Sequence, residues 1–391
     1  MAQITKRLMY KAMQERIPVS AGFELTPRCN FSCKMCYVRQ DAGQPAPLRP
    51  ASFWERIARE GMAMGLFAVV LTGGETLLYP EFWELYTALM QMGMQVTINT
   101  NGSTITPALC RQLHTLPPAR VSITLYGASN ASYARFCGDP QGFDKVQRGV
   151  ALLSEYGIPF MLSCSLGPDN AADLEQMVAF ARRYGQKLRL TAYLLPPVRR
   201  LGAAGDFSGR FTPEEAGYYT VRAEYLQSRP EVFLKLAESR QQFCTLTDAV
   251  LTDMQAGAAG TVRCQAGRCN AWIDWRGDLG GCAFLKEPKY SLDTYTFQEA
   301  WERLAAWTKA LRTAPACANC PNQEGCPSCI AALFGETKAF DQRPAYLCAM
   351  QRSCAKHYKA FARELTAAGY QADDSAALSP DACRQTEDVW S

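Results

Sequence analysis

The chain has little histidine and little excess charge. Of its 391 residues only 2 are histidine, and 41 Lys+Arg against 37 Asp+Glu leave a formal net charge of +4. So small an excess gives no basis for binding nucleic acid or an anionic membrane. No run of about eighteen apolar residues is present to span a bilayer, and the N-terminus lacks the apolar core of a signal peptide. These absences predict a cytoplasmic protein with neither nucleic acid nor membrane as partner.

Cysteine is abundant by contrast, with 17 residues. In an oxidising compartment so many thiols would form disulfides, whereas in a reducing cytosol clustered cysteines more often bind metal. The hydrophobic fraction of 48% and charged fraction of 20% are ordinary for a globular protein, so we expect a folded, metal-binding chain.

Three cysteines, Cys29, Cys33 and Cys36, lie in one short loop with the spacing C-x3-C-x2-C. Three thiolates can hold three irons of a cubane cluster and leave the fourth iron open for a ligand, whereas four would close it. The alternatives are zinc, which takes four ligands, and a disulfide, which leaves one thiol over; His114 and His357 are both distant in sequence. The spacing and its flanks resemble the cluster motif of the radical S-adenosylmethionine (radical SAM) family.

Short apolar runs alternate with helical patterns over the first half of the chain. Strands are expected at 22–26, 67–72, 95–99, 120–125, 159–164 and 188–193, with helices between them at 52–64, 80–92, 106–116, 143–156 and 173–184. This alternation predicts an α/β fold with a parallel sheet. The alternative to a barrel is a doubly wound open sheet. The cysteine loop after the first strand favours a partial (β/α)6 TIM-like barrel, because barrel sites follow the strands.

The composition predicts five segments. They are an N-terminal helical segment (1–20), the radical SAM partial barrel (21–200), a helical bridge (201–260), a small cysteine-rich iron–sulfur domain (261–350) and a C-terminal helix and tail (351–391). Helices are expected at 3–16 and 213–228. From about residue 262 cysteine is dense and Gly and Pro are frequent, so we expect metal rather than a large apolar core to hold this part. The tail beyond Tyr370 is expected to be loosely structured.

A second motif, Thr72-Gly-Gly-Glu-Thr76, follows the second expected strand. Two glycines permit positive φ and a close approach of the backbone to a ligand, and a carboxylate can accept from an ammonium. Alone, such a run is often only a turn. At this offset it matches the GGE motif of the family, although Thr76 stands where Pro is common. The resemblance implies that Gly73, Gly74 and Glu75 bind the methionyl amino group of SAM.

The resemblance implies further SAM contacts. Met35 would pack beside the adenine, and Ser122 and Arg135 would hold the carboxylate and ribose, for which the guanidinium fork of Arg is suited. An exposed Met or Arg is the plain alternative. Thr100-Asn-Gly102 is a family signature after the third strand, although Asn-Gly alone is a turn signal. Tyr126 either faces the substrate or closes the barrel.

Eight cysteines of the second half form an ordered array that includes Gly277-x4-Cys282. The array resembles the SPASM extension of radical SAM enzymes, and a pair of zinc ribbons is the alternative. The resemblance implies two closed auxiliary 4Fe–4S clusters. The first set is Cys264, Cys269, Cys282 and Cys329, and the second is Cys317, Cys320, Cys326 and Cys348. Two residues separate Cys326 from Cys329 where the family pattern has three.

Six further cysteines have no place in these patterns: Cys110, Cys137, Cys164, Cys244, Cys354 and Cys383. Most are expected to be buried small side chains. Cys137 and Cys164 follow or end barrel strands, so the alternative for these two is a role as hydrogen-atom donors.

The resemblance implies an oxidoreductase, a peptide maturase with SAM and three 4Fe–4S clusters. It would cleave SAM reductively to a 5′-deoxyadenosyl radical, take a hydrogen from a peptide or small protein, and leave an oxidative crosslink such as a thioether or C–C bond. The expected partners are the peptide and an electron donor such as flavodoxin or ferredoxin. Only 28 residues precede Cys29, too few for a leader-binding domain there, so a leader peptide is expected to be bound by another part of the chain or by a separate leader-binding protein.

Three alternatives stay open. The first is a dehydrogenase of a small alcohol or aminocyclitol. The second is a sulfatase-maturing enzyme, but relatives of that type carry an Asp after the cysteine that corresponds to Cys282, where this chain has Ala283. The third is a metal-binding scaffold without activity.

Overall fold

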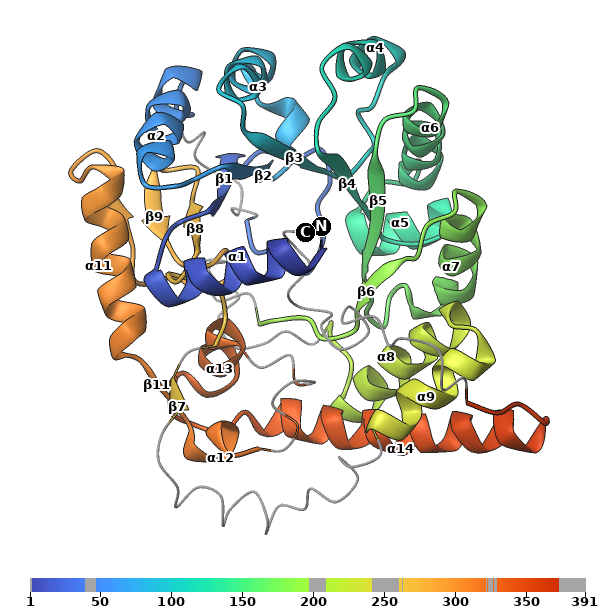
Figure 1. Cartoon of the computed structure of the whole chain (residues 1–391). Coiled ribbons are helices and arrows are strands. Elements are labelled where there is room, and N and C mark those ends of the chain that lie inside the picture. The colour runs from blue at the N-terminus through green and yellow to red at the C-terminus, as the bar shows by residue number, and fades with distance from the viewer. Residues whose placement is uncertain are drawn as a thin grey trace.

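A computed structural model describes residues 2–38, 47–196, 209–240, 260–261, 263–320, 322, 326 and 329–372. Its centre is a curved sheet with helices on the outer face (Figure 1). Six strands run in parallel: β1 (Ser20–Thr26), β2 (Ala68–Gly73), β3 (Gln95–Thr100), β4 (Arg120–Leu125), β5 (Phe160–Ser165) and β6 (Arg189–Thr191). They are neighbours in chain order, whereas a doubly wound sheet reverses its order at a switch point. The prediction of a partial barrel is therefore confirmed.

The five expected helices of the barrel are present within one or two residues of their predicted bounds. They are α2 (Ala51–Ala63), α3 (Phe82–Gln91), α4 (Pro107–Thr115), α6 (Gly142–Glu155) and α7 (Leu174–Arg183). Side chains along each strand point alternately to the helix layer and to the barrel interior. Phe23 of β1 points outward to the helices, with its ring centroid 5.1 Å from that of Trp54 on α2. The even-numbered residues of β1 therefore face the barrel interior.

One barrel helix was not expected. Helix α5 (Asn130–Cys137) lies between β4 and α6. The Ser129 side chain caps it by accepting from Ser132 N, and Gly138 ends it with φ 75°. Two single 3-10 turns, η1 (Thr76–Leu78) and η2 (Ala171–Asp173), were also not expected. We return to α5 below because it supports the cysteine loop.

The second half of the chain extends the same sheet. Strand β8 (Asn270–Ile273) pairs in parallel with β1, and β9 (Asp278–Gly280) and β10 (Tyr290–Ser291) continue the sheet in antiparallel fashion. Helix α11 (Phe297–Ala310) packs beside α2, and its Phe297 and Trp301 belong to the main apolar core. The expectation that metal replaces an apolar core here is wrong for this stretch, because hydrophobic packing against the barrel already holds it. The domain boundaries themselves stay predictions.

The remaining elements surround the open side of the barrel. Two short strands, β7 (Gly260–Thr261) and β11 (Arg312–Thr313), pair with each other, and short helices α12 (Pro315–Ala318) and α13 (Ile330–Thr337) follow. Helices α8 (Pro213–Gln227) and α9 (Pro230–Arg240) pack on the long α14 (Ala345–Ala367). The expected helix at 213–228 is thus confirmed. The tail after residue 372 lies outside the described residues.

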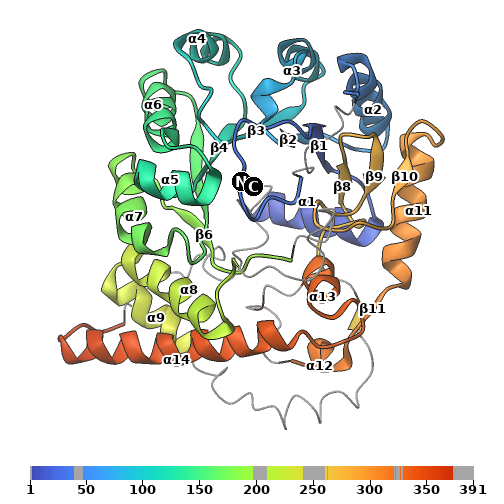
Figure 2. The same cartoon turned by 180° about the vertical axis from the view of Figure 1, so that it is seen from behind.

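Helix α1 (Ala2–Glu15) crosses the barrel axis on the side where the strands begin (Figures 1 and 2). Its end is fixed to the second half of the chain. Arg16 Nη1 donates to Gly267 O at 3.1 Å and to Thr308 Oγ1 at 2.7 Å, and Trp301 Nε1 donates to Arg16 O at 2.8 Å. Within the described residues no helix combines the length and the apolar character needed to cross a membrane.

Candidate active site at the cysteine loop

The cysteine triplet follows β1, at the edge of the sheet where the parallel strands end. Cys29 is exposed, Cys33 is buried and Cys36 is half-buried. The loop turns on itself, with Cys36 N donating to Cys33 O at 3.3 Å. Phe31 N donates to Cys29 Sγ at 3.4 Å. The edge at which the strands end is where barrel enzymes carry their chemistry, so the triplet lies in the expected place.

Helix α5 holds this loop in place. Ser32 N donates to Cys137 O at 2.7 Å, and Lys34 N donates to Phe136 O at 3.3 Å. Lys34 Nζ also pairs with Asp169 Oδ2 at 2.7 Å across the loop after β5. The last turn of α5 is therefore a platform for the middle of the cysteine loop. Sequence reasoning missed it because a helix this short has no clear period.

The electrostatics of the triplet fit a cluster. Burial is the main reason that the pKa of the Cys29 thiol is raised to about 12, and the charges of Glu75, Cys33 and Cys36 raise it further. The hydrogen bond from Phe31 N acts in the opposite direction and lowers this pKa. The thiolate therefore needs a cation to form at neutral pH. No three His, Cys, Asp or Glu residues in the described part of the chain lie at single-ion spacing. A cubane holds its thiolates farther apart, because irons and sulfides stand between them.

The GGE segment is bound to the strand that leads into the cysteine loop. Gly74 N donates to Thr26 O at 2.7 Å, and Glu75 N donates to Arg28 O at 2.8 Å. Gly73 has φ 141°, and a Cβ there would lie 2.4 Å from Thr26 O. A Cβ on Gly74 would lie 2.2 Å from Arg28 O. The glycines are required because two backbones touch here, whether or not a ligand also approaches.

The Glu75 carboxylate is fully buried and turned into the protein. Its Oε1 accepts from Thr100 Oγ1 at 2.7 Å and from Leu77 N at 3.1 Å, and its Oε2 accepts from Asn101 N at 2.7 Å. Burial raises the pKa of Glu75, and these three hydrogen bonds oppose the rise. The carboxylate ties the end of β3 to the GGE segment. Its role as a SAM ligand stays a prediction.

Asn101 joins the same network from the end of β3. The sequence marked it as part of the Thr100-Asn-Gly102 signature and of a turn, but assigned it no contact in the site. Its Nδ2 donates to Asn30 Oδ1 at 2.9 Å and lies 3.8 Å from Cys29 Sγ. Asn30 Nδ2 in turn donates to Ser103 Oγ at 2.8 Å. The signal that pointed to Asn101 was its position just past a parallel strand, at the functional edge of the sheet.

The other predicted SAM contacts are spread over several elements. Met35 is partly buried against the core, and Ser122 is half-buried in the middle of β4. Arg135 is exposed on α5, where its Nη2 donates to Ser132 Oγ at 3.0 Å and to Asp169 O at 3.4 Å. Ser122 and Arg135 thus belong to different elements, and their joint role in holding SAM stays a prediction.

Tyr126 packs beneath the cysteine loop. Its ring stacks on Phe136 at 5.5 Å between centroids and meets Phe31 edge-on at 6.4 Å. Burial, with the nearby Cys33 charge, raises the pKa of Tyr126 well above its ordinary value. The neutral ring therefore supports the loop from below.

Three cysteines of the first predicted auxiliary set lie together. Burial and the Cys329 charge raise the pKa of Cys264 to about 11 and that of Cys282 to about 12. Both pack with Cys329 around a small apolar cluster that contains Leu285 and Ile330. The fourth, Cys269, is fully buried at the start of β8, and its carbonyl accepts from Ser20 N at 3.2 Å.

Three cysteines of the second predicted set also lie together. Burial raises the pKa of Cys317 to about 11, and the charges of Cys348 and Cys320 add to the rise. Burial likewise raises the pKa of Cys320, and the Cys348 charge raises it further. Cys326 is half-buried. All eight ligand assignments stay predictions.

The leftover cysteines pack as core where they are described. Cys164 Sγ lies 3.8 Å from Met177 Sδ on the helix side of the sheet, and Cys354 Sγ lies 3.7 Å from Gly217 O. Cys110 and Cys137 are fully buried, and the thiol of Cys137 forms a hydrogen bond with that of Cys33. Cys244 and Cys383 lie outside the described residues.

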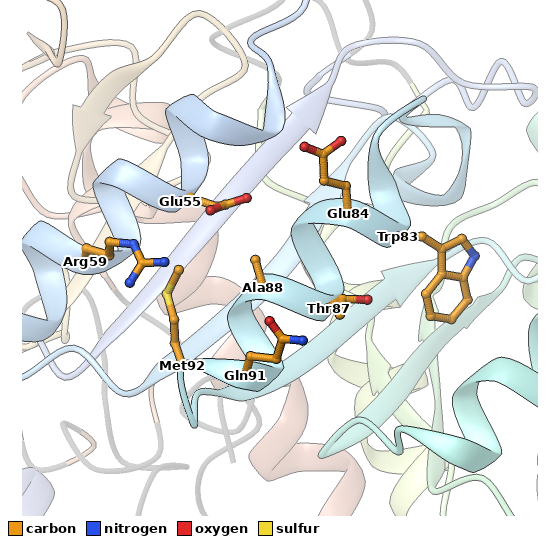
Figure 3. A pocket seen from close by; sticks show the side chains of 8 residues that line it. All are labelled: Glu55, Arg59, Trp83, Glu84, Thr87, Ala88, Gln91 and Met92. Atoms are coloured by element: carbon orange, nitrogen blue, oxygen red, sulfur yellow. The ribbon is translucent and has the colours of Figure 1, made fainter.

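A surface groove lies between α2 and α3 (Figure 3). Its lining residues are Glu55, Arg59, Trp83, Glu84, Thr87, Ala88, Gln91 and Met92. These side chains project from the outer helix layer, whereas the cysteine loop lies beyond the ends of the strands. The groove is therefore separate from the candidate site.

The fold and site together define the class, an α/β half-barrel protein with a three-thiol loop at the ends of its strands. Residues 23–181 match the model of the Radical SAM superfamily. This part of the chain is a radical SAM domain, and such a domain implies SAM and one 4Fe–4S cluster.

Relatives extend the similarity over most of the chain. An AdoMet-dependent heme synthase of Methanosarcina barkeri is 22% identical over 342 residues, which are 84% of this chain and 96% of the relative. The mycofactocin maturase MftC of Mycobacterium tuberculosis is 28% identical over 326 residues, 81% of this chain and 79% of the relative. The crystal structure of Streptococcus suis SuiB bound to its precursor peptide SuiA has a TM-score of 0.61 at 16% identity, covering 87% of this chain and 79% of that one. This structural likeness shows the fold.

Proposed function

We propose that this protein is a radical SAM oxidoreductase that modifies a peptide, with the second half of the chain as a SPASM domain. The observation that carries the proposal is the joining of the two motifs. The loop with Cys29, Cys33 and Cys36 and the GGE segment are bound together by Gly74 N to Thr26 O and Glu75 N to Arg28 O. Three thiols at the edge where the strands end, beside a backbone that has room for glycine alone, suit a cluster with one open iron.

When bound, the cluster and SAM supply a 5′-deoxyadenosyl radical that takes a hydrogen atom from the substrate. The protein's part is binding, orientation and exclusion of water. Cys29, Cys33 and Cys36 hold the cluster, and α5 fixes the loop that carries them. We assign the amino group of SAM to Gly73, Gly74 and Glu75, and its remaining contacts to Met35, Ser122 and Arg135.

Two auxiliary 4Fe–4S clusters complete the proposal. Cys264, Cys269, Cys282 and Cys329 hold the first, and Cys317, Cys320, Cys326 and Cys348 hold the second. The close grouping of three thiols in each set supports this division. Closed cages of four thiolates suit electron transfer, so the two clusters together would carry away the one electron that the substrate radical gives up in an oxidative modification. A flavodoxin or ferredoxin would supply the starting electron, and the reducing cytoplasm would preserve the thiols.

A peptide substrate is supported by MftC and by SuiB with its bound precursor peptide. A separate leader-binding protein belongs to this proposal. The heme synthase favours a second candidate, a reaction on a small molecule instead of a peptide, because the match to this chain covers 96% of that relative. A sulfatase-maturing activity is disfavoured, because Ala283 follows Cys282.

The first test is anaerobic reconstitution with iron and sulfide. Three 4Fe–4S clusters predict about 12 irons per chain, together with conversion of SAM to 5′-deoxyadenosine under a strong reductant. The Cys33→Ala variant is expected to lose about four of these irons and the cleavage of SAM. Zinc in place of iron, with SAM left intact, would refute the proposal.

The second test identifies the substrate. A short peptide encoded beside the gene, incubated with the reconstituted enzyme, is expected to lose two hydrogens by mass spectrometry. Cleavage of SAM that such a peptide does not stimulate, but a tetrapyrrole or small alcohol does, would favour the second candidate.

A further inference from the structure

Asn101 connects the two motifs of the candidate site. It is the first residue after β3 and is only 6% exposed. Its backbone N–H donates to Glu75 Oε2 at 2.7 Å, which binds it to the GGE segment. Its side-chain Nδ2 lies 3.8 Å from Cys29 Sγ, within reach of a hydrogen bond to sulfur. One residue thus touches both the GGE carboxylate and a predicted cluster thiol.

The orientation of the Asn101 amide is fixed by its neighbours. Its Oδ1 accepts from Ser103 N at 2.9 Å and from Ser103 Oγ at 2.7 Å. The Nδ2 group must then face the other way, toward Asn30 Oδ1 at 2.9 Å and Cys29 Sγ. A flipped amide would place two acceptors together on one side and two donors on the other. The donor therefore points at the sulfur by necessity.

We propose that Asn101 is a positioning residue that donates a hydrogen bond to Cys29 Sγ and thereby raises the reduction potential of the cluster that the triplet holds. The inference rests on the proposed function. Reduction adds negative charge to a cluster, and a donor on a ligand sulfur stabilises that charge. Phe31 N, 3.4 Å from the same sulfur, is a second donor. Removal of the Asn101 donor alone is expected to make the cluster harder to reduce.

Two variants remove the donor in different ways. Asn101→Asp keeps an oxygen for Ser103 N and Ser103 Oγ but has no N–H for Cys29 Sγ. Asn101→Leu has nearly the same size, adds no charge and also lacks the donor. The matched control is Asn30→Asp, which adds the same charge beside Cys29 and keeps the oxygen that accepts from Asn101 Nδ2.

The readout is the midpoint potential of the reconstituted holoenzyme, followed by EPR, for the cluster signal that changes when SAM is added. Both Asn101 variants are expected to have a lower potential than the wild type, and Asn30→Asp is expected to stay closer to it than Asn101→Asp does. Resonance Raman bands of the Fe–S(Cys) bonds are expected to shift in the Asn101 variants. Iron content shows whether each variant carries the cluster. If Asn101→Leu does not assemble it, the potential of Asn101→Asp compared with that of Asn30→Asp tests the inference.

An unchanged potential in Asn101→Leu, or an equal fall in Asn101→Asp and Asn30→Asp, would overturn the inference while the proposed function stands. A wild-type holoenzyme with no SAM-responsive signal would overturn the proposed function itself, and this inference with it.

Discussion

Glu75 uses one carboxylate to satisfy backbone N–H groups on two different segments. Oε1 accepts from Leu77 N and Oε2 accepts from Asn101 N. A glutamine at this position has a single carbonyl oxygen. Whichever way its amide turns, an NH2 group faces a backbone N–H at close range. Glu75→Gln is therefore expected to lower the free energy of unfolding by about 1–3 kcal/mol, the usual cost of an unsatisfied buried donor.

Urea denaturation of the cluster-free protein measures this effect. The control is Glu84→Gln, on the exposed face of α3, which is expected to change stability by less than about 0.5 kcal/mol. Equal, small effects of the two substitutions would show that Glu75 is not the clamp described here.

The sequence predicts those residues of the site that belong to a short local motif. Cys29, Cys33, Cys36, Gly73 and Gly74 are recognisable because each group belongs to a short motif. The contact of Asn101 with Cys29 and the support of the loop by Cys137 are not, because each joins segments that are far apart in sequence, by 72 and 105 residues. No periodicity carries information over such separations.

At the scale of elements, the joint between β1 and β8 connects the two halves of the chain. Gly22 pairs with Trp272, and a Cβ on Gly22 would lie 2.3 Å from Trp272 Cε3, so the indole lies flat on the strand. Trp272 Nε1 donates to Glu24 Oε1 at 2.5 Å, and the Glu24 side chain is fully buried. The joint thus combines close packing with a hydrogen bond to a buried carboxylate.

Trp272→Phe keeps a ring on Gly22 but removes the indole N–H. Because hydrogen bonds to charged groups contribute about 1.5–3 kcal/mol, a loss of stability of that size is expected in chemical denaturation. Trp83→Phe, on the outer face of α3, is the matched control and is expected to cost much less. A Trp272→Phe protein as stable as the Trp83→Phe protein would mean that the bond to Glu24 contributes nothing net.

The joint also shows where prediction of the fold from sequence ends. Apart from α5 and the two 3-10 turns, the strands and helices from Gly22 to Tyr184 were predictable because each βα unit is a local repeat of alternating patterns. The pairing of β8 with β1 joins Ser20 to Asn270, 250 residues apart. The four residues of β8 carry no pattern of their own that would indicate parallel pairing.

For the whole molecule, the buried thiols make stability depend on pH. The pKa values of Cys29, Cys282 and Cys354 are raised to about 12, and those of Cys264 and Cys317 to about 11, in each case mainly by burial. In the unfolded chain a thiol titrates near 9.0. The folded, cluster-free protein therefore holds its protons more tightly than the unfolded chain does.

The sign of the effect follows directly. Raised thiol pKa values contribute stability that is fully present below about pH 9 and is lost as pH rises from there toward 11–12. The free energy of unfolding of the cluster-free protein, measured by urea denaturation, is expected to be flat near neutral pH and to fall above about pH 9. Iron-loaded protein is the control, because ligand thiolates have already lost their protons. Its stability is expected to fall less over the same range, because only Cys354 of these five thiols is not a predicted ligand. Equal slopes for the two forms would mean that Cys29, Cys264, Cys282 and Cys317 do not bind the clusters.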